Sequence, residues 1–438
     1  MHAYSPERRT ALVLCGTGAH GAYHAGVLRA IEEAGVKIDV VAGQGIGAAA
    51  AALSAIDGAA KLWEDGGVWR SQRVAGFYRP KRAIRLAWWL AFVVAVLAAI
   101  PLLLLAAGVS RPNLARVALA VPVAAAVAFM LMARRAPSKR RATGRWWWRL
   151  TGAPLDGAGA RDQVVGAAWQ LIRGAVQAAH PSRAVVGRRY SEVLSENLSQ
   201  PGFRELMVMA TDVDTKRDVV AAMLREPFRH AFMASQPGRE RKAEAIDLAG
   251  TGRDLAFEII AGAMTPPVGC DLHPITFAPD SFWRGETHRF CDRPGLIERL
   301  LSELAAAGVT QAIVVNAASP VSAPHRLASP RFDTRGRLGE FLAAAECAAV
   351  QQALDASGAR FEALYLICPA HNPVGPFDFA GAYDDASDRR HSLFELMERA
   401  YEDAYRQFIE PAVGASGEQL ARPAGADGLA NRTDIESA

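Results

Sequence analysis

The first 56 residues contain the same pattern twice: a short apolar segment, a glycine-rich turn and a helical stretch. Ala11 to Cys15 is apolar and leads through glycines 16, 18 and 21 into a helix-like segment at 22–34. The second copy runs from Asp39 to Ala42, turns at 43–47 and continues as an alanine-rich helix to residue 56. Apolar runs of strand length that alternate with helices predict a mainly parallel α/β sheet.

The alternation returns after Phe203. The tail from Gly414 onward is rich in Gly, Ala and polar residues, and we expect it to be disordered. The later strands are expected at 206–212, 310–316 and 361–368, and the later helices at 296–307, 338–356 and 392–408.

Two long stretches between these halves carry no charge. Leu86 to Val109 contains no charged residue, and Val117 to Ala133 repeats this after a short polar break. A helix needs about 20 apolar residues to cross the roughly 30 Å hydrocarbon core. The sequence predicts a transmembrane hairpin with helices at about 86–109 and 114–133. A re-entrant hairpin and a buried helical hairpin are the alternatives.

This hairpin is expected to interrupt one α/β domain. The predicted segments are 1–70, the first part of that domain; 71–150, the hairpin with basic flanks; 151–200, a linker and amphipathic helix; 201–413, the second part; and 414–438, the tail.

Basic residues crowd on both sides of the hairpin, although the formal net charge is only +4. The loop between the spans holds only Arg111 and Arg116. The positive-inside rule therefore places the α/β domain in the cytoplasm. The two spans predict a multi-pass membrane protein, as in a bacterial inner membrane. Trp88, Trp89 and the tryptophans at 146–148 suit the headgroup region. No nucleic-acid recognition motif accompanies the charge, so we expect no nucleic-acid partner.

The first glycine loop has two uses in proteins. In a dinucleotide-binding fold, G-x-G-x-x-G brings N–H groups to a pyrophosphate, and an acidic residue ends the second strand. Here the nearest acid, Asp39, begins that strand, which removes the second anchor. The other use is an oxyanion hole, in which free N–H groups at a helix start face developing negative charge.

The second turn reads Gly43-Gln44-Gly45-Ile46-Gly47. This is the G-x-S-x-G nucleophile elbow with glycine at the centre, where the serine would stand. Glycine tolerates the strained backbone of such a turn. The substitution therefore predicts an elbow that keeps its shape and has lost its nucleophile.

The segment from Ala11 to Gly35 resembles the opening of patatin-like phospholipases, and Met209-Ala-Thr-Asp-Val-Asp-Thr215 is similar to a later strand of that family. The resemblance implies a three-layer α/β sandwich. Its catalytic aspartate falls on Asp292, ahead of Arg293-Pro-Gly295, and its serine falls on Gly45. The implied oxyanion hole comprises Gly16, Thr17, Gly18, Ala19, His20 and Gly21.

The chain departs from that family at three points. Gly45 replaces the serine, His20 stands where a basic Arg or Lys is usual, and Arg293-Pro294 follows the aspartate in place of a glycine. We expect Arg293 to pair with Asp292 and hold it ionised but weakly basic. Substitute nucleophiles are not evident: Ser54 lies beyond the elbow, and Cys15 is expected to be a buried structural thiol. His20 and His24 could titrate near neutrality, but with no nucleophile to assist we expect them to pack in the loop or lie at the surface. Asp212 and Asp214 are expected to satisfy a turn at the end of a strand.

The leading hypothesis is a membrane-bound pseudoenzyme that binds lipid or acyl chains or acts in regulation. The alternative is an active lipid acyl hydrolase with a non-standard nucleophile, or with a water molecule activated by Asp292. A third hypothesis, a nucleotide-binding membrane protein, rests on the glycine spacing alone. We expect membrane lipids as partners, with a phospholipid or fatty acyl ligand, and no cofactor. The five cysteines form no C-x-x-C pair, so no metal site is predicted.

Overall fold

The computed structural model describes residues 4–108, 116, 120–128, 152–174, 181–234, 243–279, 281, 283–319, 331 and 333–414. Within this part, the central sheet is 9-stranded, with the order β11-β10-β1-β2-β5-β6-β7 and with β9 joining β5 to β8. The strands from β11 to β5 pair in parallel. The strand bounds are β1 Thr10–Cys15, β2 Val40–Gly43, β3 Arg79–Pro80, β4 Leu155–Asp156, β5 Glu205–Asp212, β6 Arg217–Met223, β7 Ala243–Asp247, β8 His273–Thr276, β9 Thr287–Cys291, β10 Gln311–Asn316, β11 Ala363–Ile367, β12 Ala382–Asp384 and β13 Arg389–His391.

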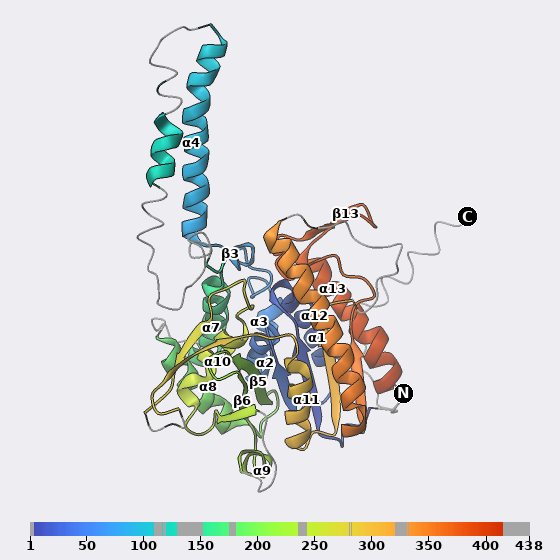
Figure 1. Cartoon of the computed structure of the whole chain (residues 1–438). Coiled ribbons are helices and arrows are strands. Elements are labelled where there is room, and N and C mark those ends of the chain that lie inside the picture. The colour runs from blue at the N-terminus through green and yellow to red at the C-terminus, as the bar shows by residue number, and fades with distance from the viewer. Residues whose placement is uncertain are drawn as a thin grey trace, which may run out of the picture. The chain divides into compact units, whose positions relative to one another are not determined.

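Helices cover both faces of this sheet (Figure 1). On one face, α1 packs against α13 and α2; on the other, α11 packs against α12. The described helices are α1 Gly21–Glu33, α2 Gly47–Ala55, α3 Ala60–Trp63, α4 Arg82–Ala106, α7 Ala158–Arg173, α8 Arg183–Asn197, α9 Phe228–Met233, α10 Ala256–Ala263, α11 Leu296–Ala306, α12 Thr334–Ser357 and α13 Leu393–Ala404, with 3-10 turns at Gly18–His20, Val74–Gly76, Arg253–Leu255 and Gly358–Arg360 and a π-helical segment at Tyr405–Val413.

The strand β1 shows why this arrangement forms. All six of its residues are buried, as expected for a parallel strand covered on both faces. Its alternate residues Ala11, Val13 and Cys15 belong to one apolar cluster with Leu300 and Leu304 of α11. The predicted α/β class and the mainly parallel sheet are therefore confirmed.

The antiparallel side of the sheet differs from the expectation. Strands β6, β7, β8 and β9 were not predicted, and β6 and β9 both run antiparallel to β5. Helix boundaries also move to capping residues. Asp333 accepts a hydrogen bond from the Gly336 N–H at 2.7 Å, so α12 begins four residues earlier than expected. Ser392 and Glu395 form a capping box at the start of α13.

The described chain divides into two compact units. Unit 1 contains residues 1–78, 157–267 and 272–438, and unit 2 contains 79–156 and 268–271. At the base of unit 2, β3 pairs antiparallel with β4, so that Arg79 lies opposite Asp156. The Leu155 N–H donates to the Gly269 carbonyl at 2.8 Å, which joins the two parts of this unit.

Unit 2 contains the helix α4, which is 25 residues long. Its segment Ile84–Pro101 has a mean hydropathy of 2.0, and 6% of that segment is buried. Among the described residues, this is the one helix long and apolar enough to cross a membrane. Of the second predicted span, only residue 116 and the helical residues 120–128 are described. The rest of that span, the tryptophans at 146–148 and the tail after residue 414 lie outside the described residues.

Candidate functional site

The glycine loop (residues 16–21) and the elbow (residues 43–47) lie at one edge of the sheet. They follow β1 and β2, which pair in parallel with Leu14 opposite Gly43, so both loops leave the carboxyl ends of neighbouring strands. Asp292 follows β9, whose Cys291 lies opposite Thr211 of β5, next to β2. The topology therefore brings three separate sequence segments to one place.

Gly45 and Asp292 face each other across this site. A Cβ atom built on Gly45 would lie 2.8 Å from Oδ2 of Asp292, and the carbonyl oxygen of Gly16 would lie closer still. Real Cβ atoms essentially never approach other heavy atoms within 3.0 Å. The φ angle of Gly45 is +57°, in the left-handed region that favours glycine. Position 45 therefore has no room for a serine in this conformation.

The flanking glycines serve the close approach of strand and helix. A Cβ on Gly43 would come within 2.6 Å of the Ala48 nitrogen, and one on Gly47 within 2.6 Å of the Leu14 carbonyl carbon. This is the backbone crowding of a nucleophile elbow. Gln44 is buried, and its side-chain Oε1 has no hydrogen-bond partner in the described part of the chain.

Two backbone donors at this site are already engaged. The N–H of Ile46, the residue after Gly45, donates to the Gly16 carbonyl at 2.8 Å. In the nucleophile elbow of hydrolases this N–H belongs to the oxyanion hole. The N–H of Ala19, in the glycine loop, donates to the Pro376 carbonyl at 2.7 Å. Neither N–H is free to stabilise an oxyanion in this conformation.

Asp292 is buried, with 3% of its surface exposed. Burial, reinforced by the nearby carboxylate of Glu346, raises the pKa of Asp292 to about 8. The backbone N–H of Arg293 donates to Oδ1 at 2.8 Å. The Thr17 hydroxyl lies 3.3 Å from Oδ2, but its one proton also faces Glu346, to which it is closer. These contacts favour the ionised form but do not outweigh the loss of solvation. The carboxyl group is therefore mostly protonated at neutral pH.

The expected pairing of Arg293 with Asp292 is wrong. The Arg293 guanidinium donates from Nη2 to Asp218 of β6 at 2.8 Å, and its charge lowers the pKa of Asp292 less than burial raises it. Only the Arg293 backbone contacts the aspartate. The predicted ionised, weakly basic carboxylate is replaced by a buried and largely neutral one.

Glu346 is a site residue that the sequence analysis missed. Its side chain is 2% exposed, and its Oε1 accepts a short hydrogen bond from the Thr17 hydroxyl. His20 of the glycine loop places Nδ1 3.5 Å from Oε2 of the same carboxyl. The signal was present: Glu346 falls in the buried stripe of α12 formed by Leu342, Val350 and Ala353.

His24 does not titrate near neutrality. It is fully buried, and burial lowers its pKa to about 4. Its Nε2 lies 2.9 Å from the Cys15 carbonyl, an acceptor, so Nε2 carries the proton. Burial also raises the pKa of the Cys15 thiol, as do the nearby carboxylates of Glu346 and Asp292, which agrees with a structural thiol.

The remaining candidates lie elsewhere. The Ser54 hydroxyl accepts from Arg204 at 2.8 Å. Asp212 accepts from the Asp214 and Thr215 N–H groups in a tight turn. In the described part of the chain, no group of three or more His, Cys, Asp or Glu side chains could hold a metal ion.

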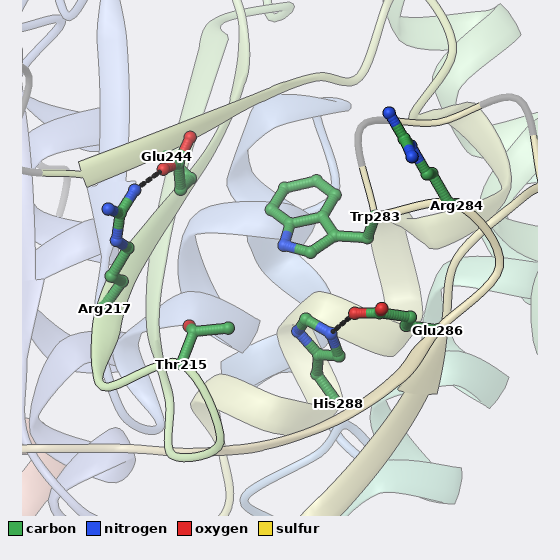
Figure 2. A pocket seen from close by; sticks show the side chains of 7 residues that line it. All are labelled: Thr215, Arg217, Glu244, Trp283, Arg284, Glu286 and His288. Atoms are coloured by element: carbon green, nitrogen blue, oxygen red, sulfur yellow. Dashed lines mark hydrogen bonds and ion pairs between the residues drawn. The ribbon is translucent and has the colours of Figure 1, made fainter.

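A pocket of about 380 Å³ lies beside β9 (Figure 2). Figure 2 shows the Trp283 indole between two ion pairs, Arg217–Glu244 and Glu286–His288, the latter 3.0 Å long. Burial lowers the pKa of His288, but its bonds to Glu286 and Asp212 outweigh this and raise it. None of the site residues predicted from the sequence lines this pocket. The pocket is lined by Thr215, Arg217, Glu244, Trp283, Arg284, Glu286 and His288.

Three comparisons place the chain among known proteins. Residues 12–165 match the family model described as patatin-like phospholipase, which contains the glycine loop and the elbow but ends before Asp292. No curated protein matches.

Two solved structures align with low scores. VipD from Legionella pneumophila has 11% identity and a TM-score of 0.30, covering 92% of this chain and 67% of that one. The type III effector protein ExoU has 16% identity and a TM-score of 0.20, covering 70% of this chain and 60% of that one. Alignments with such scores support no argument about function. With the glycine loop, elbow and parallel sheet described above, the family match leads to one conclusion: residues 12–165 of this chain are similar to patatin-like phospholipases.

Proposed function

We propose that this protein is a membrane-attached member of the family that binds lipid or acyl ligands and has lost Ser–Asp hydrolysis. The observation that carries this proposal is the state of position 45. The residue is glycine, and the Gly16 carbonyl and Asp292 carboxyl crowd the place of its side chain. The nucleophile and the space for it are thus both lost.

The neighbouring groups support this proposal. The Ile46 N–H, an oxyanion donor in an active elbow, is bonded within the protein. A water molecule activated by Asp292 would need an ionised carboxylate in contact with solvent. Asp292 is buried and its pKa is raised to about 8, so it is a poor base at neutral pH.

The membrane attachment rests on α4. Trp88 and Trp89 are 75% and 66% exposed, and the apolar side chains that follow are also largely exposed. Exposed apolar surface of this extent calls for a membrane or a partner. We propose that α4 and the second apolar stretch cross the membrane as a hairpin and leave the α/β domain in the cytoplasm.

The test uses the full-length protein in detergent. We expect no covalent labelling by a fluorophosphonate and no burst with activated esters, together with phospholipid or fatty acid that co-purifies by mass spectrometry. Labelling that maps to the elbow region would overturn the loss of chemistry. A lipid-free protein that added fatty acid or phospholipid does not stabilise would overturn the binding role.

A second candidate function, hydrolysis by another serine, is favoured by one arrangement. Ser387 lies in the exposed turn between β12 and β13, with Oγ 2.9 Å from Nε2 of His391. The Nδ1 atom of His391 lies 3.5 Å from Oε2 of Glu395. Burial, with the charges of Arg399 and Arg389, lowers the pKa of His391, so the ring is neutral and can accept a proton.

The same turn also argues for a structural role. The Ser387 hydroxyl lies 2.7 Å from Oδ2 of Asp384, to which it donates, and would have to rotate to donate to His391. Ser387→Ala separates the two readings. Loss of fluorophosphonate labelling and of ester hydrolysis in this variant would establish the serine as the nucleophile. Absence of labelling in the unmodified chain would exclude it.

A further inference from the structure

A pocket of about 470 Å³ lies in unit 1, between the segment around α3 and the helix α7. Its walls are residues 61–73 and 162–173, so none of the Gly45 site residues contributes to it. It contains side chains of both charges, and the pairing of these charges decides what it can bind.

Each carboxylate in the pocket already has a cationic partner. Glu64 pairs with Lys61 in a short contact, and Asp65 pairs with Arg70 at 2.7 Å. Asp162 pairs with Arg183, also at 2.7 Å. The negative charges of the pocket are therefore neutralised within the protein.

Two lining cations remain. Arg73 and Arg173 have no carboxylate partner among the residues that the structure describes. The Nε of Arg173 and the indole Nε1 of Trp169 are buried and have no hydrogen-bond partner there. Both are donors only, and a buried donor without an acceptor is costly. The pocket is thus lined by two arginines without a carboxylate partner, and two of its lining residues each have a buried N–H group that lacks an acceptor in the described part of the chain.

The helix itself explains only part of this arrangement. Arg173 stands in the last turn of α7, where the helix dipole favours a cation. The dipole does not satisfy the Nε–H of Arg173 or the Nε1–H of Trp169. An anion with several oxygen acceptors would satisfy both, and guanidinium groups suit phosphate oxygens because they can donate two parallel hydrogen bonds.

We propose that this pocket binds the phosphate group of a ligand through Arg73, Arg173 and the Trp169 N–H. Either a phosphomonoester lipid headgroup or a free phosphomonoester supplies this chemistry. The proposal is independent of the Gly45 site, so either proposal can fail alone.

The experiment measures binding to the full-length protein in a maltoside detergent, which contains no phosphate. Calorimetry and thermal shift are recorded with inorganic phosphate, glycerol 3-phosphate and dihexanoyl phosphatidic acid, and with dihexanoyl phosphatidylcholine as the zwitterionic control. The variants are Arg73→Gln, Arg173→Gln and Trp169→Phe, which removes only the N–H donor. Arg189→Gln is the charge-matched control, because Arg189 is exposed on α8 and pairs with Glu192.

We expect Arg173→Gln and Arg73→Gln each to weaken phosphate-ligand binding by about 10-fold or more, since bonds to charged groups are strong. Trp169→Phe should weaken it less, and Arg189→Gln should leave it unchanged. Phosphatidic acid that binds at least 10-fold more tightly than glycerol 3-phosphate would identify a lipid headgroup; equal affinity would identify a soluble phosphate. No binding by any phosphate ligand, or equal binding by all four variants, would overturn the proposal.

Discussion

The backbone N–H of Ile46 donates a hydrogen bond to the carbonyl oxygen of Gly16 at 2.8 Å, which joins the elbow to the glycine loop. Two segments that would cooperate in a hydrolase to hold an oxyanion thus satisfy each other. The same carbonyl crowds the space beside Gly45. The Gly16 carbonyl therefore both accepts the Ile46 N–H and occupies the space that a side chain at position 45 would need.

Restoring the serine should not restore activity. Gly45→Ser places a Cβ 2.8 Å from the Asp292 carboxyl and closer still to the Gly16 carbonyl, so the loop or the elbow must shift. An unfavourable backbone conformation alone costs roughly 1–3 kcal/mol. We expect Gly45→Ser to lower the free energy of unfolding by more than this, because the clash adds to the strain. Chemical denaturation measures it. Gly35→Ser is the matched control, because Gly35 has φ +66° and nothing within 4 Å of its Cβ position. Equal losses in both variants would show that no clash exists.

Asp292→Asn should change how stability depends on pH. A free carboxyl has a pKa of about 3.9, whereas that of Asp292 is about 8 when folded. Between these values the folded chain holds a proton that the unfolded chain has released, so the free energy of unfolding falls as pH rises. The asparagine variant lacks this term. The free energy of unfolding of the variant minus that of the unmodified protein should therefore be larger at pH 8 to 9 than at pH 4. Parallel stability curves from pH 4 to 9 would contradict the buried neutral carboxyl.

Glu346→Gln should shift the same curve. The charge of Glu346 is the second cause of the raised pKa of Asp292, and its removal lowers that pKa. The free energy of unfolding falls with rising pH only up to the pKa of Asp292 in the folded protein. In the variant this fall should therefore end at a lower pH than in the unmodified chain. Glu340→Gln is the control, because Glu340 lies on the same helix but is exposed. A shift of the same size in both variants would mean that Glu346 does not act on Asp292.

The pH profile of any residual ester hydrolysis should identify its source. Hydrolysis through Asp292 should rise only as pH passes about 8, because the carboxyl must ionise first. Hydrolysis through Ser387 should reach its plateau below neutrality, because the pKa of His391 is lowered from its usual 6.5. Initial rates from pH 5 to 9, with Asp292→Asn and Ser387→Ala in parallel, distinguish them. A profile that neither variant alters would exclude both residues.

The membrane topology predicts opposite labelling of two positions. A cysteine introduced at Asn113, in the loop between the two apolar stretches, should react with an impermeant thiol reagent added outside the cell. A cysteine at Gly414 should react only after the cells are opened. The unmodified chain gives the background, since it has five cysteines of its own. Outside labelling of Gly414→Cys would refute the cytoplasmic placement.

Much of the fold could be predicted because buried parallel strands appear in the sequence as continuous apolar runs. β1 and β2 are short, fully buried runs, each followed by a glycine turn and a helix. The strands β8 and β9 are different: their residues alternate between buried and exposed, and they include His, Pro and Arg. Four or five residues with such a composition give too weak a period to be recognised.

The site divides in the same way. The spacing of glycines predicts an elbow at 43–47, and Gly45 has a positive φ angle of +57°, which glycine tolerates in a strained turn. The buried stripe of α12 could have revealed Glu346, since an acid among apolar positions needs a partner. The direction of the Gly16 carbonyl could not be predicted. It depends on both backbone angles of Gly16, whose φ is +144°, and glycine permits many combinations of φ and ψ.

The pairing of β3 with β4 has a consequence for the history of the chain. Arg79 lies opposite Asp156, so the two ends of the segment 79–156 meet in one short two-stranded stem. Doubling the length of a flexible loop costs only about 0.6 kcal/mol. A long or a short inserted segment at this stem therefore has nearly the same loop-closure free energy. Evolution could therefore acquire, exchange or discard the apolar segment without disturbing the ancestral fold, and an engineer could splice a short turn at the same stem.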